Sequence, residues 1–341
     1  RQRQMCIRDS FCIWRIIMQY ALELKNVHYA YHTLEGETYA LKDITFSVRE
    51  GEFIALVGPS GCGKSTLLHL IAGLLTPEKG LIKINGSYHP DNTSCIGYML
   101  QKDELLEWRT IYQNVLLGLE IQHALTTRSR ALARALLTQY GLNAFANARP
   151  SELSGGMRQR VVIAIALACN PELLICDEPT TALDVTIQAK ILELIRNIQK
   201  KTGISVIYIT HDLGVVAKVA DYVNVMYAGK IVEKGSIDEI FYDPKHPYTW
   251  GLLSAMPDLN TADSRLFTIP GSPPNLQKPV CGDAFAPRNK YALKIDSRVE
   301  PPMFKISDSH FAATWLLHPL APKVEMPDCL LYTSPSPRDT R

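Results

Sequence analysis

Hydrophobic and polar positions alternate along residues 20–56, where aromatic and β-branched residues recur at a spacing of two. This period predicts β-strands, with turns at residues 35–36 and 50–51, because successive side chains of a strand point to opposite faces. Residues 53–57 are wholly apolar and end at Gly58, which is typical of a short strand buried on both faces.

Further along the chain, short apolar runs alternate with longer segments of helical period. Helices are predicted over residues 65–75, 128–140 and 161–168, and buried strands over residues 173–176 and 206–209. The third helical segment is apolar on nearly all sides, so we expect it to be buried. The alternation of strand and helix predicts an α/β core.

The proline content of the sequence rises after about residue 243. Prolines recur at short intervals from Pro244 to Pro302. Because proline fixes φ and lacks a backbone donor, this region is predicted to be an extended, loop-rich appendage rather than another α/β layer.

The two ends of the chain carry a different signal. Residues 5–10 (Met-Cys-Ile-Arg-Asp-Ser) and 329–334 (Cys-Leu-Leu-Tyr-Thr-Ser) can be encoded by DNA strings that are reverse complements over most of their length. Both strings resemble a transposase sequencing adapter read in opposite directions. We therefore expect residues 1–17 and 328–341 to derive from an adapter; the alternative is two ordinary tails.

Composition narrows the class of protein. The formal net charge is only +2, which is too small to favour a nucleic-acid partner. Eight cysteines are present without any Cys-x-x-Cys pair, and those inside apolar runs are typical of core residues in a reducing compartment. No apolar stretch approaches the roughly 18 residues of a membrane-spanning helix, so membrane association is expected through a partner.

Residues 58–65 read Gly-Pro-Ser-Gly-Cys-Gly-Lys-Ser, which fits the pattern G-x-x-x-x-G-K-[ST] between a predicted strand and a predicted helix. The glycines allow backbone N–H groups to turn inward around a phosphate, and the helix presents its positive end to the same anion. Lys64 supplies a charge for the β- and γ-phosphates, and the Ser65 hydroxyl suits Mg²⁺. The alternative is a glycine-rich turn before an ordinary helix. The predicted ATP-binding residues here are Gly58, Pro59, Ser60, Gly61, Cys62, Gly63, Lys64, Ser65 and Thr66.

Two adjacent acids, Asp177 and Glu178, end the apolar strand predicted over residues 173–176. Unpaired carboxylates are costly at the end of a buried strand, which favours a functional reason for them. Asp177 would reach Mg²⁺ through water, and Glu178 would polarise the attacking water. The alternative is a solvated strand end.

A second candidate anion site lies at residues 153–157, which read Leu-Ser-Gly-Gly-Met. Ser154, Gly155 and Gly156 open the apolar helix expected from about Val161, so they form a second helix N-terminus suited to binding an anion. Two phosphate sites in one monomer cannot serve the same ATP unless they are adjacent. The economical interpretation is that each site caps an ATP held by the other subunit; the alternative is a serine-capped helix with a flexible start.

The phosphate loop, Leu-Ser-Gly-Gly-Met, Asp177-Glu178, Ala182-Leu-Asp184 and a lone His211 occur in this order. Together they resemble the nucleotide-binding domain of ABC transporters over about residues 20–257. The resemblance implies an α/β P-loop NTPase cassette, with a RecA-like core, an antiparallel β subdomain and a helical subdomain, followed by a Pro-rich C-terminal extension. It also implies a head-to-tail dimer with two ATP molecules at the interface.

The resemblance assigns further roles. Gln101 is expected to sense Mg²⁺ and relay to the membrane subunit, Asp184 to cross the dimer interface, and His211 to contact the γ-phosphate. The implied catalytic residues are Glu178, His211 and Gln101, and the implied Mg²⁺ ligands are Ser65, Gln101 and Asp177. Tyr31 is the first choice for the aromatic residue that stacks on adenine, and Tyr39 is the second.

The resemblance also divides the chain. It implies a nucleotide-binding domain over residues 18–243, with its helical subdomain at about residues 100–160, and an extension of oligopeptide-importer type over residues 244–327. Many extensions of this type hold an iron–sulfur cluster on four cysteines. The corresponding positions here are Asp283, Asn289, Ile295 and Thr314, so we expect no cluster.

The type of transporter is less uniform along the chain. The phosphate loop and residues 96–110 resemble importers of nitrate, sulfonate or taurine, whereas residues 169–188 and 246–253 resemble importers of oligopeptides and dipeptides. We hypothesise that two genes were joined near residues 154–161; the competing view is one natural protein with mixed features.

The predicted function is therefore that of an ATP-hydrolysing subunit of an importer, with peptides as the preferred substrate class. The alternatives are an importer of nitrate-type anions and a chimeric ATPase coupled to no transporter. Implied partners are a second ATPase subunit, two transmembrane permeases and an extracytoplasmic solute-binding protein, at the cytoplasmic face of the plasma membrane. ABC ATPases of DNA repair carry a coiled-coil insertion, and ribosomal ones carry two cassettes; this chain has neither.

Overall fold

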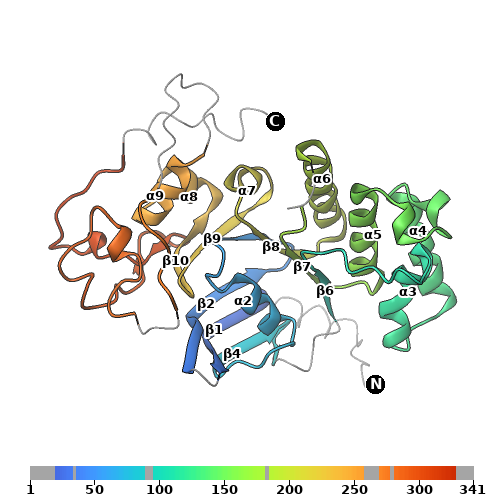
Figure 1. Ribbon diagram of the computed structural model, residues 1–341, viewed down its shortest axis with the longest axis horizontal. Coiled ribbons are helices and arrows are strands. Elements are labelled where there is room, and N and C mark those ends of the chain that lie inside the picture. The colour runs from blue at the N-terminus through green and yellow to red at the C-terminus, as the bar shows by residue number, and fades with distance from the viewer. Residues whose placement is uncertain are drawn as a thin grey trace, which may run out of the picture.

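Two β-sheets and their helices form the centre of the molecule, seen in a computed structural model that describes residues 20–33, 36–88, 95–180, 184–256, 269–276 and 280–327. A cluster of helices lies at one end and the C-terminal extension at the other (Figure 1). The predicted adapter-derived ends, residues 1–17 and 328–341, lie outside the described residues.

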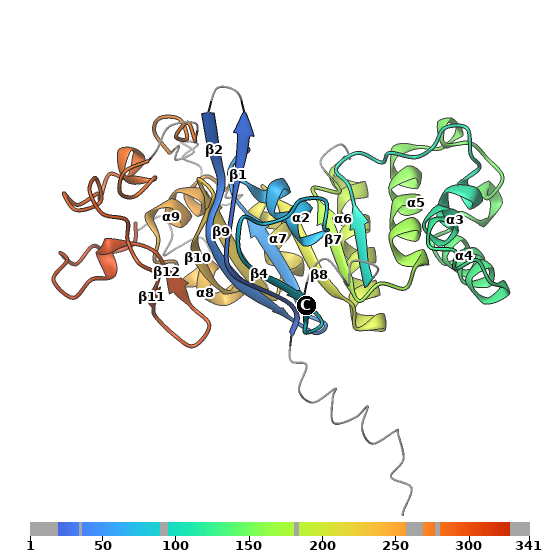
Figure 2. The ribbon, with the colours of Figure 1, turned by 90° about the horizontal axis from the view of Figure 1, so that it is seen from below.

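The first sheet is antiparallel and has the order β2-β1-β4-β5. Its strands are β1 (Tyr20–Thr33), β2 (Gly36–Arg49), β4 (Lys79–Ile84) and β5 (Ser87–Tyr88). Leu24 pairs with Phe46 and Val27 pairs with Ile44, so the apolar positions of both long strands face the core together. The long β1–β2 hairpin crosses the middle of the molecule (Figure 2). The predicted strands of this region are confirmed.

The second sheet has the order β11-β12-β10-β9-β3-β8-β7-β6. Its strands are β3 (Phe53–Val57), β6 (Ile96–Met99), β7 (Leu173–Asp177), β8 (Ser205–Thr210), β9 (Tyr222–Tyr227), β10 (Lys230–Ser236), β11 (Phe304–Lys305) and β12 (Phe311–Ala312). The strands from β9 to β6 are parallel, and β10, β12 and β11 continue the sheet antiparallel.

The strand β3 shows why its sequence is wholly apolar. Phe53, Ala55 and Val57 belong to the core cluster on one face of the sheet, and Ile54 and Leu56 to the cluster on the other face. Both faces are covered, so no polar position is left in the strand.

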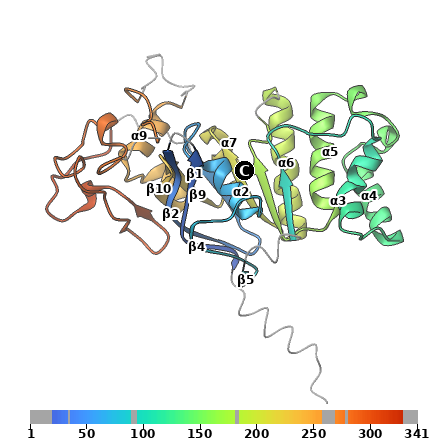
Figure 3. The ribbon, with the colours of Figure 1, turned by 60° about the horizontal axis from the view of Figure 1, so that its bottom comes forward.

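The helices are α2 (Lys64–Ile71), α3 (Ile111–Ile121), α4 (Thr127–Gln139), α5 (Gly155–Ala168), α6 (Val185–Thr202), α7 (Leu213–Val219), α8 (Ile237–Tyr242) and α9 (Pro247–Ser254). Helices α3, α4 and α5 pack against one another at one end of the molecule, while α2 lies beside the antiparallel sheet (Figure 3). The helix predicted over residues 65–75 ends earlier, at Ile71, because Gly73 takes a left-handed φ of 77°. The third predicted helix begins earlier than residue 161, at Gly155.

The described part of the C-terminal extension consists mostly of loops and short 3₁₀ turns. The sequence predicted no strand here, but β12 pairs with β10, and β11 pairs with β12, so the extension lengthens the main sheet. Two-residue strands carry no periodic signal, which is why the pattern of hydrophobic positions missed them.

A buried acid on β10 holds the extension to the sheet. The carboxylate of Glu233, which is 0% exposed, accepts hydrogen bonds from the backbone N–H groups of Lys245 (2.6 Å) and His246 (3.1 Å). It also bonds Nε2 of His310 at 2.9 Å, from the loop before β12. A buried charge is stable only with such partners, so Glu233 ties three separate segments together.

Three of the four positions that the resemblance relates to cluster cysteines accept a local backbone hydrogen bond with their side chains. The side chain of Asp283 accepts from the Phe285 N–H at 2.9 Å, that of Asn289 from the Tyr291 N–H, and that of Thr314 from the Leu316 N–H. The fourth position, Ile295, is exposed, at 39%. Among the described residues no group of three or more His, Cys, Asp or Glu side chains is placed to hold a metal. The absence of a cluster stays a prediction.

We predict that Asp283→Asn stabilises the fold in a pH-dependent way. Burial raises the pKa of Asp283 to about 6, so the folded state carries an unfavourable buried charge above that pH. The variant should raise the free energy of unfolding by about 1–3 kcal/mol at pH 7.5, and the gain should vanish as the pH falls from 6 to below 4, where the unfolded carboxyl is also protonated. Urea denaturation across this range measures it.

The exposed Glu325 of the same extension provides the control, since Glu325→Gln removes a carboxylate charge without relieving burial. A gain from Asp283→Asn that stayed constant between pH 4 and pH 7.5 would contradict the burial argument.

Candidate nucleotide-binding site

The phosphate loop connects β3 to α2, and its glycines are required by the backbone. Gly61 and Gly63 have φ values of 76° and 101°, in the left-handed region. A Cβ atom at Gly63 would lie 2.6 Å from the Ala40 carbonyl oxygen, and one at Gly58 would lie 2.4 Å from that of Met226. The loop is therefore pressed against two other strands, and α2 starts with its N–H groups directed into the loop.

The Lys64 side chain is held inside this loop. It is 7% exposed, and its Nζ donates to the carbonyl oxygens of Gly58 at 2.8 Å and Pro59 at 2.9 Å. A buried ammonium group and the N-terminus of α2 thus place positive charge at the same spot, which suits a polyphosphate.

Oxygen ligands lie together at the carboxyl ends of β6 and β7. The Ser65 hydroxyl hydrogen-bonds the carboxylate of Asp177, which is 7% exposed. Burial raises the pKa of Asp177, and the bond from Ser65 lowers it again in part. Gln101, beyond the end of β6, lines the same cavity. A hydroxyl, a carboxylate and an amide oxygen are ligands that Mg²⁺ accepts, so these residues fit the ion.

Glu178 follows Asp177 in a strained backbone conformation. Its φ of 45° is left-handed, and its N–H donates to the Ile209 carbonyl at 3.2 Å. Its side chain is largely buried, and Oε2 lies 3.5 Å from Nδ1 of His211, whose ring is largely exposed after β8. The turn thus aims a carboxylate and an imidazole at the same region.

One cavity of about 660 Å³ collects most of the predicted residues. The predicted residues that line it are Tyr31, Pro59, Ser60, Gly61, Cys62, Gly63, Lys64, Ser65, Thr66, Gln101, Asp177 and Glu178. The Tyr31 hydroxyl lies 3.1 Å from Oγ1 of Thr66, while Tyr39, the second choice, lines a different cavity.

The other predicted residues lie outside this cavity. Ser154 and Gly155 are exposed at the start of α5, and Gly156 packs near Ile187. Asp184 is exposed and caps α6, where its carboxylate accepts from the Ile187 N–H at 3.0 Å. The neighbouring residues 181–183 lie outside the described part of the chain.

The sequence analysis missed a buried polar chain that connects these two regions. Gln159 of α5 donates its amide N–H to the carbonyl of Pro179, directly after Glu178. Oγ1 of Thr180 lies 3.1 Å from the Tyr208 hydroxyl and accepts from Gln188 at 3.1 Å. The available signal was a glutamine two residues before an apolar helical run, at a position that is buried in the fold.

A second connection joins α5 to the segment after Gln101. The Arg158 guanidinium bonds both carboxylate oxygens of Asp103 and lies 3.2 Å from Glu107. The hydrogen bond to Asp103 is the main reason that the pKa of Arg158 is raised. A bidentate pair fixes direction as well as distance, so the start of α5 follows the segment that carries Gln101.

Three features define the class of protein. A phosphate loop follows a central strand of a mostly parallel sheet, an antiparallel sheet lies beside it, and a second helix start, the Ser-Gly-Gly turn, is exposed. Together they are typical of an ABC-type nucleotide-binding cassette. The model of the ABC transporter family matches residues 41–181, and that of the oligopeptide/dipeptide transporter C-terminal region matches residues 232–295.

The oligopeptide transport ATP-binding protein OppD of Bacillus subtilis is 48% identical over 333 residues, 91% of this chain and 92% of that protein. The dipeptide transport ATP-binding protein DppD of Lactococcus lactis is 43% identical over 91% of this chain and 95% of its own length. The chain therefore belongs to the family of oligopeptide and dipeptide transport ATP-binding proteins, and it is an ATP-hydrolysing ABC cassette.

Solved structures agree with the fold. The dimeric bacterial ABC transporter cassette MJ0796 is 34% identical, with a TM-score of 0.58, and is matched over 98% of its length by 63% of this chain. A dimeric post-hydrolysis state of the same cassette, bound to ADP and Pi, matches at 33% identity with a TM-score of 0.57.

The hypothesis of two joined genes finds no support in these comparisons. These two peptide-transport relatives match at 43% and 48% identity over 91% of the chain, a span that extends well to either side of the suggested junction at residues 154–161. The mixed features of residues 96–110 therefore give no evidence of a nitrate- or sulfonate-type half.

We predict that Arg158→Met lowers the rate of ATP hydrolysis about three- to tenfold, while the affinity for ATP changes little. The pair with Asp103 orients α5 relative to Gln101 but does not line the cavity, so its loss should affect turnover rather than binding. Steady-state hydrolysis and a titration with a fluorescent ATP analogue separate the two effects.

Arg130→Met, on the exposed surface of α4, is the matched control and should leave both measurements unchanged. If Arg158→Met hydrolysed ATP at the unaltered rate, the ion pair would have no part in turnover.

Proposed function

We propose that this chain binds and hydrolyses Mg-ATP to energise an importer of oligopeptides or dipeptides, at the cytoplasmic face of the plasma membrane. Its partners are a second ABC ATPase subunit, two transmembrane permeases and an extracytoplasmic solute-binding protein. Support for the peptide class comes from the names of the relatives and from the match of the extension. No helix in the described part of the chain is long and apolar enough to cross a bilayer.

One observation carries the proposal. Within the described residues, the phosphate loop and the Ser-Gly-Gly turn each open a helix start suited to an anion, and of these two the start at the phosphate loop lies in the nucleotide cavity. The Ser154–Gly156 start is exposed outside that cavity, where a second subunit could bring its own nucleotide. The proposed complex is a sandwich in which each ATP is bound by the phosphate loop of one subunit and covered by the Ser-Gly-Gly turn of the other.

The residues of the cavity divide the chemistry between them. Lys64 and the N-terminus of α2 bind the β- and γ-phosphates. Ser65, Asp177 and Gln101 would hold Mg²⁺, which neutralises charge on the phosphates when bound. Glu178 orients and polarises the attacking water, and His211, 3.5 Å from it, lies beside the γ-phosphate. Tyr31 stacks on the base, and Asp184 contacts the partner subunit.

Hydrolysis then reopens the sandwich. Closure of the two subunits would move α5, and the Arg158–Asp103 pair would pass that movement to the segment containing Gln101. We propose that this segment forms the surface that contacts the permease. The domains are accordingly the cassette, residues 18–243, and the extension, residues 244–327.

We predict that Glu178→Gln binds Mg-ATP but loses at least about 100-fold in turnover, because the amide cannot polarise water as a carboxylate does. ATP-bound dimers should therefore accumulate, which size-exclusion chromatography with Mg-ATP measures.

Glu193→Gln, an exposed acid on α6, is the control and should hydrolyse ATP normally. Lys64→Ala in the same background should abolish the dimer by weakening nucleotide binding. A Glu178→Gln protein that stayed monomeric with Mg-ATP present would refute the sandwich.

Peptide transport itself is tested in cells that lack their own peptide-importer ATPase but express the matching permeases and binding protein. The wild-type chain should restore uptake of a labelled di- or oligopeptide, and Glu178→Gln should not. Normal ATP hydrolysis without restored uptake, or restored uptake of taurine or nitrate instead, would refute the peptide assignment.

A further inference from the structure

The nucleotide cavity has a wall that comes from the C-terminal extension. Pro273, Pro274, Asn275 and Leu276 line the same cavity as Lys64 and the rest of the phosphate loop, about 200 residues earlier in the chain. We propose that residues 273–276 contact the base and ribose of bound ATP, and that Arg288 positions them there. This inference rests on the proposed binding of ATP in this cavity.

The path of the segment places it at the base end of the cavity. In the main sheet β9 and β10 lie on one side of β3, whereas β7 and β6, which carry Asp177 and Gln101, lie on the other side. The segment is fixed to the end of β9, as shown next. It therefore enters from the side of β1, β2 and the β9–β10 turn, where Tyr31, Ala40 and Ala228 line the cavity.

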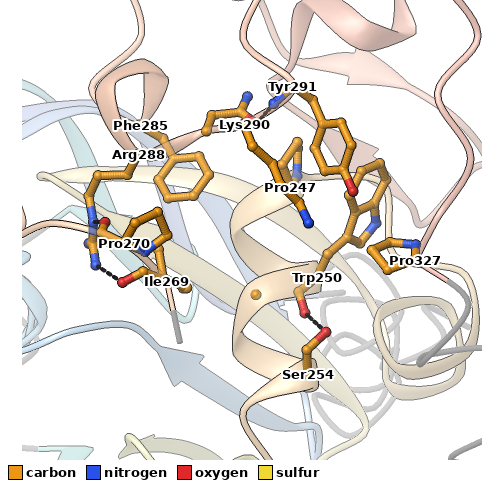
Figure 4. Close-up of a pocket in the computed structure, with 12 residues that line it drawn as sticks. Pro247, Trp250, Ser254, Ile269, Pro270, Phe285, Arg288, Lys290, Tyr291 and Pro327 are labelled. Carbon is orange, nitrogen blue, oxygen red and sulfur yellow. Dashed lines mark hydrogen bonds between the residues drawn. The ribbon is translucent and has the colours of Figure 1, made fainter. Parts of the chain in front are cut away.

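Arg288 fixes the start of the segment through three hydrogen bonds, and Figure 4 draws the two that it makes to Ile269 and Pro270. Its Nε donates to the Pro270 carbonyl at 2.8 Å, and its Nη2 to the Ile269 carbonyl at 3.3 Å. Its Nη1 donates to the hydroxyl of Tyr227, the last residue of β9, at 3.2 Å. One planar guanidinium thus joins the extension to the strand that leads directly into Ala228.

Packing and a turn complete this anchor. Ile269 lies against Gly251 of α9, where a Cβ atom would come within 2.6 Å of the Ile269 Cγ1. The aromatic rings of Tyr227, Tyr248 and Phe285 pack against one another at centroid distances of 4.7 to 5.4 Å, and Tyr227 is the residue that Arg288 bonds. Gly271 then turns the chain with a φ of 71°, so the residues after it lie against the cavity.

The chemistry of the wall suits a base rather than phosphate. Two consecutive prolines offer flat apolar faces and no backbone N–H, and Leu276 adds a further apolar side chain. Phosphate oxygens need hydrogen-bond donors, whereas the face of a purine and the ribose ring bury well against apolar groups. Tyr31 on β1 and residues 273–276 would then cover the nucleoside from two elements of the fold.

The test compares two probes that share the phosphates but differ in the nucleoside: Mg-ATP and inorganic tripolyphosphate. The triple variant Pro273→Ala, Pro274→Ala, Leu276→Ala and the single variant Arg288→Met should each raise the Kd for Mg-ATP about tenfold (~1.4 kcal/mol). The Kd for tripolyphosphate should stay within about twofold. Arg298→Met, an exposed arginine of the same extension, should change neither Kd. Lys64→Ala should weaken both.

Three outcomes would overturn the inference: unchanged affinity for Mg-ATP in both variants, equal loss for the two probes, or a loss confined to tripolyphosphate. A wild-type chain that bound neither probe would instead refute the proposed function. Labelling of the wild-type protein with 8-azido-ATP gives an answer that does not depend on how the variants fold. Adducts should map to residues 269–276 as well as to the Tyr31 strand, and adducts absent from 269–276 would also overturn it.

Discussion

The nucleotide site depends on backbone contacts so close that only glycine permits them. The phosphate loop, β2 and the β9–β10 turn meet at one point, where Cβ atoms at Gly63 and Gly229 would lie 2.6 and 2.7 Å from the same carbonyl, that of Ala40. The Gly229 N–H also donates to the Cys62 carbonyl at 3.0 Å. This contact locks the antiparallel sheet, which carries Tyr31, to the loop that carries Lys64, so these two side chains keep a fixed separation across the cavity.

Charge is then distributed by the order of the strands. The carboxyl ends of parallel strands meet at one edge of the sheet, which brings the end of β3 together with the ends of β7 and β6. Positive charge from Lys64 and α2 lies beside the buried carboxylate of Asp177, whose raised pKa shows that burial is only partly compensated by Ser65. A magnesium nucleotide would complete this arrangement, with its phosphates on the positive side and its cation near the carboxylate.

Local chemistry was predictable from the sequence, and long-range contacts were not. The phosphate loop, the acid pair and the buried strands each lie within one short segment, so the residues of that segment are enough to predict them. The alternation in residues 20–56 likewise predicted β1 and β2. By contrast, the bond from Gln159 to Pro179 and the bonds from Arg288 to Ile269 and Pro270 join segments that no local period relates. The pairing of β12 with β10 is likewise accompanied by a buried Glu233–His310 hydrogen bond between residues 77 positions apart, which no local pattern indicates.

The extension is best understood as an addition to the base end of the site rather than to its phosphate chemistry. The dimeric cassette MJ0796 is matched over nearly its whole length by 63% of this chain, so the phosphate loop and its partners form a complete unit without the remainder. The extension is nevertheless held to that unit by several contacts, which include those of Glu233 on β10 and of Arg288 at the end of β9. If the anchored segment contacts the nucleoside, linkage requires that ATP stabilise the anchored extension by the same factor by which the extension strengthens the binding of ATP. The binding of nucleotide and the anchoring of the extension are then thermodynamically coupled, through contacts that lie outside the phosphate loop.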